Sequence, residues 1–217
     1  MYASGDMKAM DLGHPINAVT PPLLGRALEV LSGTTRPLSG REIGRIIGEG
    51  SPNGVWNALR RLERQGLVLT DRRANATYYS ANRDHLAWSA VESLARLRVS
   101  LVASVRSEFE QWDIAPIHAS IFGSFARGDA DTDSDLDILV IRPATMTSSQ
   151  SDDWDAQVAR LQDRVWRWTG NHCQVFAVDA DRLAAYVRAD DPLVSAWVRD
   201  EMLLVGHSIA RHVKEVE

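Results

Sequence analysis

Apolar residues between positions 22 and 65 recur every three or four residues, which is the period of a helix with one buried face. Ser39 with Glu42 three residues later is the sequence pattern of a capping box, so a helix is expected to begin after Ser39. Ser51, followed by proline, is expected to cap another helix, which ends at Gly66. The pattern therefore predicts three helices, over 22–32, 40–48 and 51–65.

Two short β-type runs follow these helices. Residues 67–70 and 77–80 are mostly apolar, β-branched or aromatic, and the mainly polar stretch 71–76 between them is typical of a hairpin tip. A long helix is expected over 84–113, because apolar residues recur at helical spacing as far as Trp112. Its apolar face has two interpretations: it covers the cores of both halves of the chain, or it forms a dimer interface.

The second half of the chain alternates between apolar strands and helices. Apolar runs predict strands over 117–122, 135–141 and 172–178, with a helix over 152–169 before the last of them. A further helix and a final strand are expected within 191–206.

The net charge of −5 is unevenly distributed along the chain. Residues 21–85 carry ten Arg against six Asp and Glu (+4), residues 86–217 carry thirteen Lys and Arg against twenty-one Asp and Glu (−8), and the first twenty residues add −1. A basic N-terminal half suits a polyanionic partner, whereas the acidic half does not. A single cysteine and the lack of any run of about 20 apolar residues indicate a cytoplasmic protein without a membrane segment.

The segment from Ser51 to Val68 resembles the recognition helix and first wing strand of MarR- and ArsR-type winged helix-turn-helix regulators. In such a helix, Asn can pair with adenine and Arg with guanine in the major groove, while wing arginines meet phosphate or the minor groove. The resemblance covers roughly residues 21–83. It implies that duplex DNA is contacted by Asn53, Trp56, Asn57, Arg60, Arg72 and Arg73.

Other interpretations of this half stay open. The arginines of the helix can form a solvated face, and many winged helices serve only as protein-interaction modules. Trp56 departs from the small polar residue usual at its position, and it contacts either a thymine methyl group or a partner. Because regulators of this kind usually read two half-sites as dimers, a homodimer is expected.

A spaced motif in the second half carries the candidate chemistry. Gly123 and Ser124 end the first predicted strand, ten residues separate Ser124 from Asp135, and Asp137 stands two residues further on. This pattern of Gly-Ser, ten residues and Asp-x-Asp, with Ala-Arg-Gly inside it, closely resembles the signature of the DNA polymerase β-like nucleotidyltransferases, especially the minimal MNT group and the aminoglycoside nucleotidyltransferases. The resemblance covers about residues 117–208 and implies a small domain with a mixed sheet.

The residue types of the motif suit metal and nucleotide binding. Alternate residues of a strand point to one side, so Asp135 and Asp137 can bind one metal cluster. Their hard oxygens suit Mg²⁺, and two such ions would activate an acceptor oxygen and neutralise a leaving pyrophosphate. The resemblance makes these two residues catalytic. It assigns the nucleotide to Gly123, Ser124 and Arg127, although Arg127 could instead pair with the acidic loop that follows it.

The family's third carboxylate is missing from its expected position. The residue that matches it is Gln174, and Asp179 at the end of the same strand is an alternative acid. One hypothesis is an enzyme that transfers a nucleoside monophosphate, AMP from ATP, to a hydroxyl of a small molecule or of a partner protein, as in toxin–antitoxin pairs. The other is a transcriptional regulator whose domain senses a nucleotide with little or no catalysis. Gln174 favours the regulator, and the intact motif favours the enzyme.

These patterns divide the chain into four segments. A disordered leader is expected over 1–20, where no apolar region typical of a signal peptide occurs. A winged helix-turn-helix domain over 21–83, a connecting helix over 84–113 and a nucleotidyltransferase domain over 114–217 follow. The expected fold class is α+β.

Overall fold

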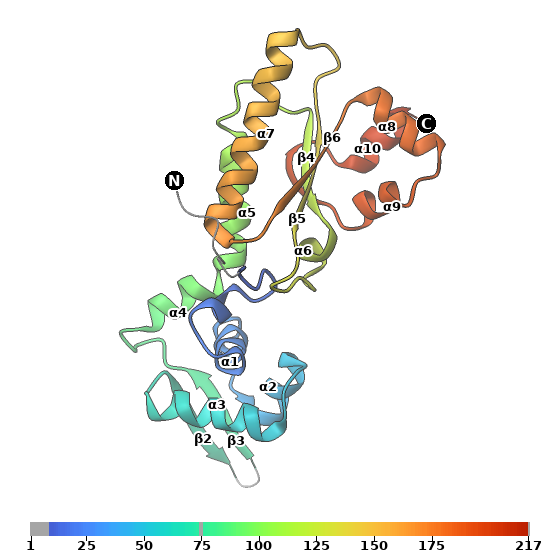
Figure 1. Cartoon of the computed structure of the whole chain (residues 1–217). Helices are drawn as coiled ribbons and strands as arrows, with labels where there is room; N and C mark the ends of the chain where they lie inside the picture. Colours follow the sequence, from blue (N-terminus) through green and yellow to red (C-terminus); the bar gives the residue numbers. More distant parts are fainter. Residues whose placement is uncertain (1–8, 74–75, 217) are drawn as a thin grey trace. The chain divides into compact units, whose positions relative to one another are not determined.

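The computed structural model describes residues 9–73 and 76–216, which divide into two compact units (Figure 1). The first unit spans His14–Val99. The second combines residues 9–13 with the chain from Ser100 onward. The buried apolar residues of the first unit form a core of their own, separate from those of the second. In the described residues, no helix is long and apolar enough to cross a membrane.

The first unit packs helices against a small antiparallel sheet. Its sheet has the strand order β1-β3-β2, and β2 and β3 form the expected hairpin. The helices expected before the hairpin also lie at the predicted positions. In chain order the elements are η1 (Pro15–Ala18), α1 (Pro22–Ser32), β1 (Leu38–Ser39), α2 (Gly40–Ile47), α3 (Pro52–Arg64), β2 (Val68–Arg73), β3 (Ala76–Ala81) and α4 (Trp88–Ala95).

Side-chain caps fix where α2 and α3 begin. Ser39 Oγ accepts a hydrogen bond from Glu42 N at 3.2 Å, and Ser39 N donates to Glu42 Oε2 at 2.8 Å, which completes the predicted capping box. Ser51 Oγ accepts from Gly54 N at 3.1 Å and so caps α3. A cap of this kind contributes about 1 kcal/mol to helix stability. Because α3 begins at a fixed residue, the side chains that it buries and those that it exposes are fixed as well.

The second unit is built on a four-stranded mixed sheet with the order β6-β5-β4-β7. β5 and β6 are parallel, and the other pairs are antiparallel. This order confirms the mixed sheet expected from the sequence. Two helices of the second unit, α8 and α10, were not expected. In chain order the elements are α5 (Leu97–Phe109), β4 (His118–Phe122), α6 (Gly123–Arg127), β5 (Leu136–Ile141), α7 (Ser148–Thr169), β6 (Cys173–Val178), α8 (Ala180–Arg188), α9 (Pro192–Arg199), β7 (Met202–Gly206) and α10 (Ile209–Val216).

The two faces of this sheet bury different sets of helices. Strand residues such as Ile121 and Ile138 belong to one core with the apolar side chains of α5 and α7. Their neighbours Phe122 and Leu139 point the other way and form a second core with α8, α9 and α10. Figure 1 shows this layering, with α5 and α7 on one side of the strands and α8–α10 on the other. The ends of β4 and β5 are therefore held from both faces.

The segment before α1 is packed rather than disordered. Met10 N donates to Thr169 O at 2.8 Å and to Asn171 Oδ1 at 3.1 Å, and Leu12 is fully buried in the core of the second unit. Ile16 of η1 is fully buried in the core of the first unit. The expected disorder therefore does not hold for residues 9–20, because their few apolar side chains fill these cores; residues 1–8 lie outside the described residues.

The long helix expected over 84–113 is two helices, α4 and α5, that separate at Arg96. Each packs on a different core: Trp88 and Val91 of α4 on that of the first unit, and Val105 and Phe109 of α5 on that of the second. The helix is interrupted because its two halves pack on cores in different units. The segment contains no Gly or Pro that would have predicted the interruption. The apolar face of the segment is thus used within the chain, so it no longer argues for a dimer.

Leu12→Ala tests whether the N-terminal segment is part of the folded second unit. The substitution should lower the free energy of unfolding by about 2–4 kcal/mol, because it removes a fully buried side chain and leaves a cavity. Urea denaturation measures this change. Val19→Ala is the control, because Val19 is 63% exposed and its truncation should cost under about 0.5 kcal/mol. Equal, small losses in both variants would contradict the packing of Leu12.

Candidate functional site

The candidate chemical residues of the second unit lie at one edge of three neighbouring strands. Phe122, the last residue of β4, pairs with Asp137 in the antiparallel β4–β5 ladder. Asp137 in turn pairs with Gln174 in the parallel β5–β6 ladder. The strand register therefore brings Gly123, which follows Phe122, to the same edge as Asp137 and Gln174.

Position 123 has to be a glycine for two reasons, its backbone conformation and the close approach of Asp137. Its φ angle of +75° lies in the left-handed region that side chains disfavour. A Cβ atom at this position would stand 2.5 Å from Asp137 Oδ2. The glycine therefore lets the carboxylate lie directly against the backbone at the start of α6, and Ser124 is the next residue of that helix.

The ionised form of the Asp137 carboxyl is energetically unfavourable at this edge of the sheet. Burial, and after it the nearby negative charge of Asp135, raise the pKa of its carboxyl to about 6, while the guanidinium of Arg127 acts in the opposite direction. A raised carboxyl pKa means that the folded protein disfavours the ionised form. The two carboxylates are thus close enough to repel each other, and a cation bound between them would relieve that repulsion.

Gln174 contacts the acidic pair directly. Its Nε2 donates a hydrogen bond to Asp135 Oδ2 at 2.6 Å. In the described residues, no three His, Cys, Asp or Glu side chains gather in a way that could hold a metal ion. Asp179 does not take the third place, because it caps α8 through Arg182 N (2.9 Å) and accepts a hydrogen bond from Arg142 Nη2 (2.7 Å).

Arg127 pairs with the acidic loop, which is one of the two roles that the sequence left open for it. Its Nε donates to Asp129 Oδ2 at 3.2 Å, within the acidic loop, and its Nη1 donates to Asp200 Oδ2 at 2.7 Å. It also stays near enough to Asp137 to lower the pKa of that carboxyl. Sequence reasoning missed Asp200, because it lies 73 residues after Arg127 and outside the motif.

The first unit exposes polar and charged side chains along one face of α3. Val55, Leu59 and Leu62 are buried. The opposite face is exposed to solvent, and 49% of Trp56 is exposed. The guanidinium of Arg60 lies over the Trp56 ring, 4.5 Å from the ring centre. The four helix positions expected to contact DNA are all on this exposed face: Asn53, Trp56, Asn57 and Arg60.

The hairpin places the other two expected arginines beside its tip. Arg72 pairs with Thr77 and Arg73 with Ala76 across the β2–β3 ladder, and both arginines are exposed. Arg73 forms an ion pair with Asp71 at 2.8 Å. Positions 74 and 75 of the expected tip lie outside the described residues.

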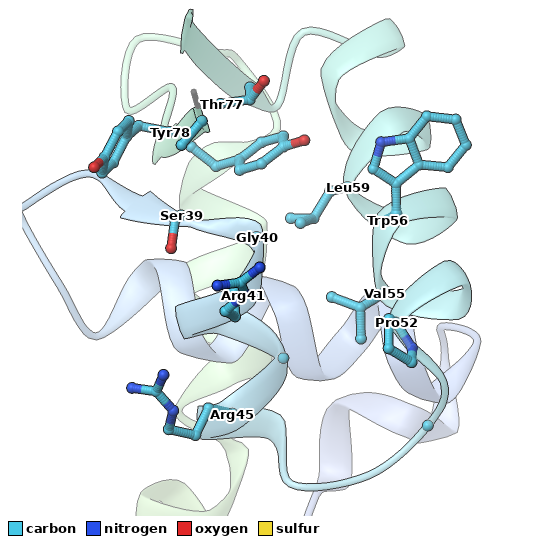
Figure 2. A pocket seen from close by; sticks show the side chains of 14 residues that line it. Ser39, Gly40, Arg41, Arg45, Pro52, Val55, Trp56, Leu59, Thr77 and Tyr78 are labelled. Atoms are coloured by element: carbon cyan, nitrogen blue, oxygen red, sulfur yellow. The ribbon is translucent and has the colours of Figure 1, made fainter. Parts of the chain in front are cut away.

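A hollow of about 780 Å³ opens between α2, α3 and β3 (Figure 2). Figure 2 shows Arg41 and Arg45 on α2, across from Trp56 on α3. None of its lining residues is acidic. Sequence reasoning missed Arg41 and Arg45, although their spacing of four residues places them on one face of a helix. Among the described residues, no ion pair with an acidic side chain is formed by Arg41, Arg45, Arg60, Arg61, Arg64 or Arg72.

A comparison with known protein families matches part of the second unit. A model of the nucleotidyltransferase domain family matches residues 101–169, which is 69 of the 217 residues and includes β4, α6, β5 and α7. Nucleotidyl transfer is the activity that this match indicates. No curated protein matches the chain.

Two solved structures show weak similarity to the chain. One is a variant of ZitR from Lactococcus lactis, at 17% identity and a TM-score of 0.33, covering 51% of this chain and 67% of ZitR. The other is human N-acetylserotonin methyltransferase in complex with SAM, at 14% identity and a TM-score of 0.28, covering 51% of this chain and 36% of the methyltransferase. At TM-scores this low, neither similarity indicates a shared fold.

Gly123→Ala and Gly48→Ala form a matched pair that tests the contact between Gly123 and Asp137. Both glycines have φ of +75°, but a Cβ at Gly48 meets no atom within 4 Å. The left-handed backbone should by itself make each substitution cost about 1–2 kcal/mol of stability, measured by urea denaturation. Only Gly123→Ala should also displace the Asp137 carboxylate, and thereby weaken the Mg²⁺-dependent ATP binding that the sequence leads us to expect, measured by calorimetry. Unchanged ATP affinity in Gly123→Ala would show that the contact between Gly123 and Asp137 is not needed for nucleotide binding.

Proposed function

We propose that this protein is a nucleotidyltransferase that also binds duplex DNA. It transfers a nucleoside monophosphate to a hydroxyl group of a partner protein or a small molecule, with Mg²⁺ as cofactor; the resemblance to the MNT group favours AMP, taken from ATP. The observation that carries the proposal is the meeting of Asp135, Asp137 and Gly123 at one sheet edge, inside the segment matched by the nucleotidyltransferase family.

The acidic pair fits Mg²⁺. This ion usually binds one or two carboxylates together with substrate phosphates, so two acids are a sufficient protein donor set. The raised pKa of Asp137 supports the same role, because it reflects burial of the carboxylate and, after that, the negative charge of Asp135, and a bound cation would offset both. When bound, Mg²⁺ would neutralise the carboxylates and the phosphates, and Asp135 and Asp137 would hold it.

The remaining residues of the motif are proposed to hold the nucleotide. Gly123 keeps the backbone bare where the phosphates approach, and Ser124 offers a hydroxyl and a backbone N–H beside it. Arg127 supplies a positive charge near the acidic pair. In the transfer, the acceptor oxygen forms a bond to the α-phosphorus, the bond to pyrophosphate breaks, and the hydroxyl proton has to be removed.

Gln174 supports a second candidate function. A neutral amide cannot accept the hydroxyl proton, and here it donates a hydrogen bond to Asp135. This contact favours a transcriptional regulator whose second unit binds a triphosphate as a sensor, with little or no transfer. The two functions share the nucleotide site and differ in turnover, so release of pyrophosphate from a bound triphosphate discriminates between them.

DNA binding is proposed for the first unit as a winged helix-turn-helix domain. The order of three helices and a hairpin supports this assignment, as does the exposed face of α3, which would enter the major groove. The unpaired arginines of α2, α3 and β2 support it further, because a cation without an acidic partner is available to a phosphate. Arg41 and Arg45 in the hollow would then add phosphate contacts to those of Arg72 and Arg73.

Replacing both acids tests the nucleotide site. The double variant Asp135→Asn, Asp137→Asn should weaken Mg²⁺-dependent ATP binding at least about tenfold, because it removes both charged metal ligands. Calorimetry measures the affinity, and DNA binding should be unchanged. Asp152→Asn, Asp153→Asn is the control, because it removes the same charge from exposed positions of α7. Full ATP affinity in the Asp135, Asp137 variant would show that these carboxylates are not the site.

Salt dependence tests the DNA interface. Each phosphate contact contributes about 0.9 to the slope of log affinity against log salt concentration. The double variant Arg41→Ala, Arg45→Ala should therefore lower the slope for duplex DNA by about 1.8, measured by fluorescence anisotropy. Arg36→Ala, Arg83→Ala removes the same charge from arginines that pair with Glu42 and Glu92, and should leave the slope nearly unchanged. Equal slopes in both variants would place the DNA away from the hollow.

A further inference from the structure

Asp200 lies between two arginines at the point where α9 leads into β7. Its side chain is only 2% exposed. Arg199 donates from Nε to Asp200 Oδ1 at 2.7 Å and from Nη2 to Oδ2 at 3.0 Å, while Arg127 donates from Nη1 to Oδ2 at 2.7 Å. These hydrogen bonds, those from Arg199 foremost, lower the pKa of the Asp200 carboxyl below its ordinary value. Asp200 is therefore a fixed anion that holds two guanidiniums side by side.

The strand register places this cluster next to the acidic pair. Met202, two residues after Asp200, pairs with Ile121 of β4, and Ile121 lies two residues before Gly123. Arg127 belongs to α6, which begins at Gly123, and it lowers the pKa of Asp137. The order in space is thus the acidic pair, Arg127, Asp200 and Arg199.

Both arginines keep hydrogen-bond donors that Asp200 does not use. Within the part of the chain that the structure describes, Arg127 Nη2 and Arg199 Nη1 make no hydrogen bond. The side chains are 41% and 65% exposed, so these donors can reach a ligand. Arg127 also pairs with Asp129, but that carboxylate is 62% exposed, and an exposed pair of this kind is worth about 0–1 kcal/mol. A phosphate can therefore displace Asp129 at little cost.

We propose that Arg199 is a second phosphate-binding residue of the nucleotide site, and that Asp200 positions Arg199 and Arg127 for the terminal phosphates of a triphosphate. The inference rests on the proposed function and adds to it a reason for selecting triphosphates. A guanidinium fits phosphate oxygens through paired N–H donors, and a fixed guanidinium loses less freedom on binding than a mobile one. A nucleoside monophosphate has no terminal phosphates and gains nothing from the pair.

Arg199→Ala tests the phosphate contact. The probes are ATP, AMP and inorganic tripolyphosphate, each with Mg²⁺ and the full chain, measured by calorimetry. The variant should lose about tenfold in affinity for ATP and for tripolyphosphate, the effect expected of one charged hydrogen bond, while its affinity for AMP stays unchanged. Arg199→Lys should recover part of the loss, because it restores the charge without the paired donors. Arg188→Ala is the control, since Arg188 is exposed and ends α8 as Arg199 ends α9.

The outcomes separate this inference from the proposed function. If the parent protein binds ATP and tripolyphosphate and Arg199→Ala binds them as tightly, the inference is wrong and the function stands. An equal loss in Arg188→Ala would assign the effect to net charge and would also overturn the inference. If the parent binds none of the three probes, the function and the inference fall together.

A double-mutant cycle tests the positioning role of Asp200. In an Asp200→Asn background Arg199 is no longer held by a charge, so Arg199→Ala should cost much less than the tenfold expected in the parent. A cost of tenfold in both backgrounds would remove Asp200 from the proposal. Circular dichroism checks that the Asp200→Asn variant, which changes a buried residue, is folded. If it is not, Arg127→Ala replaces Asp200→Asn in the cycle, because loss of one arginine should likewise diminish the effect of losing the other.

Discussion

The contact between Asp137 and the bare backbone at Gly123 is the constraint on which the candidate site depends. The β4–β5 register sets Phe122 opposite Asp137, so the residue after Phe122 stands in the path of the carboxylate. Only glycine accepts both the +75° φ angle and the 2.5 Å approach. The chain turns directly into α6 at this point, which keeps Ser124 and Arg127 beside the acidic pair. One register and one glycine thus decide where the charged groups of the second unit meet.

Negative and positive charges are separated along this edge of the sheet. Asp135 and Asp137 repel each other in a half-buried place, whereas Arg127 and Arg199 gather around the carboxylate of Asp200 a short way along the same edge. The metal-bound triphosphate that we propose would complement both parts, because its cation would suit the acids and its terminal phosphates would suit the arginines. Gln174 is the residue that departs from this design. Its amide donates a hydrogen bond to Asp135 but supplies neither charge nor base, which is why a sensor stands beside the transferase as a proposed function.

The sequence predicts the parts of this account that are set by short-range patterns. The spacing from Ser124 to Asp135 locates the turn between β4 and β5, and Ser39 locates the start of α2 through its capping box. The exposed face of α3 follows from helical period alone. Contacts that join distant positions stay hidden: Asp200 meets Arg127 across 73 residues, and Leu12 packs in a core built from the far end of the chain. The prediction of disorder from composition was wrong for residues 9–20, because two or three buried apolar side chains are enough to order that segment.

A crystal structure grown with Mg²⁺ and a non-hydrolysable ATP analogue tests the central claim most directly. The account predicts metal density bound by carboxylate oxygens of both Asp135 and Asp137, with the phosphates lying along Gly123 and Ser124. This result is expected for the enzyme and for the sensor alike, because both use the same site. A nucleotide bound elsewhere on the chain, with the two carboxylates free of metal, would contradict the account.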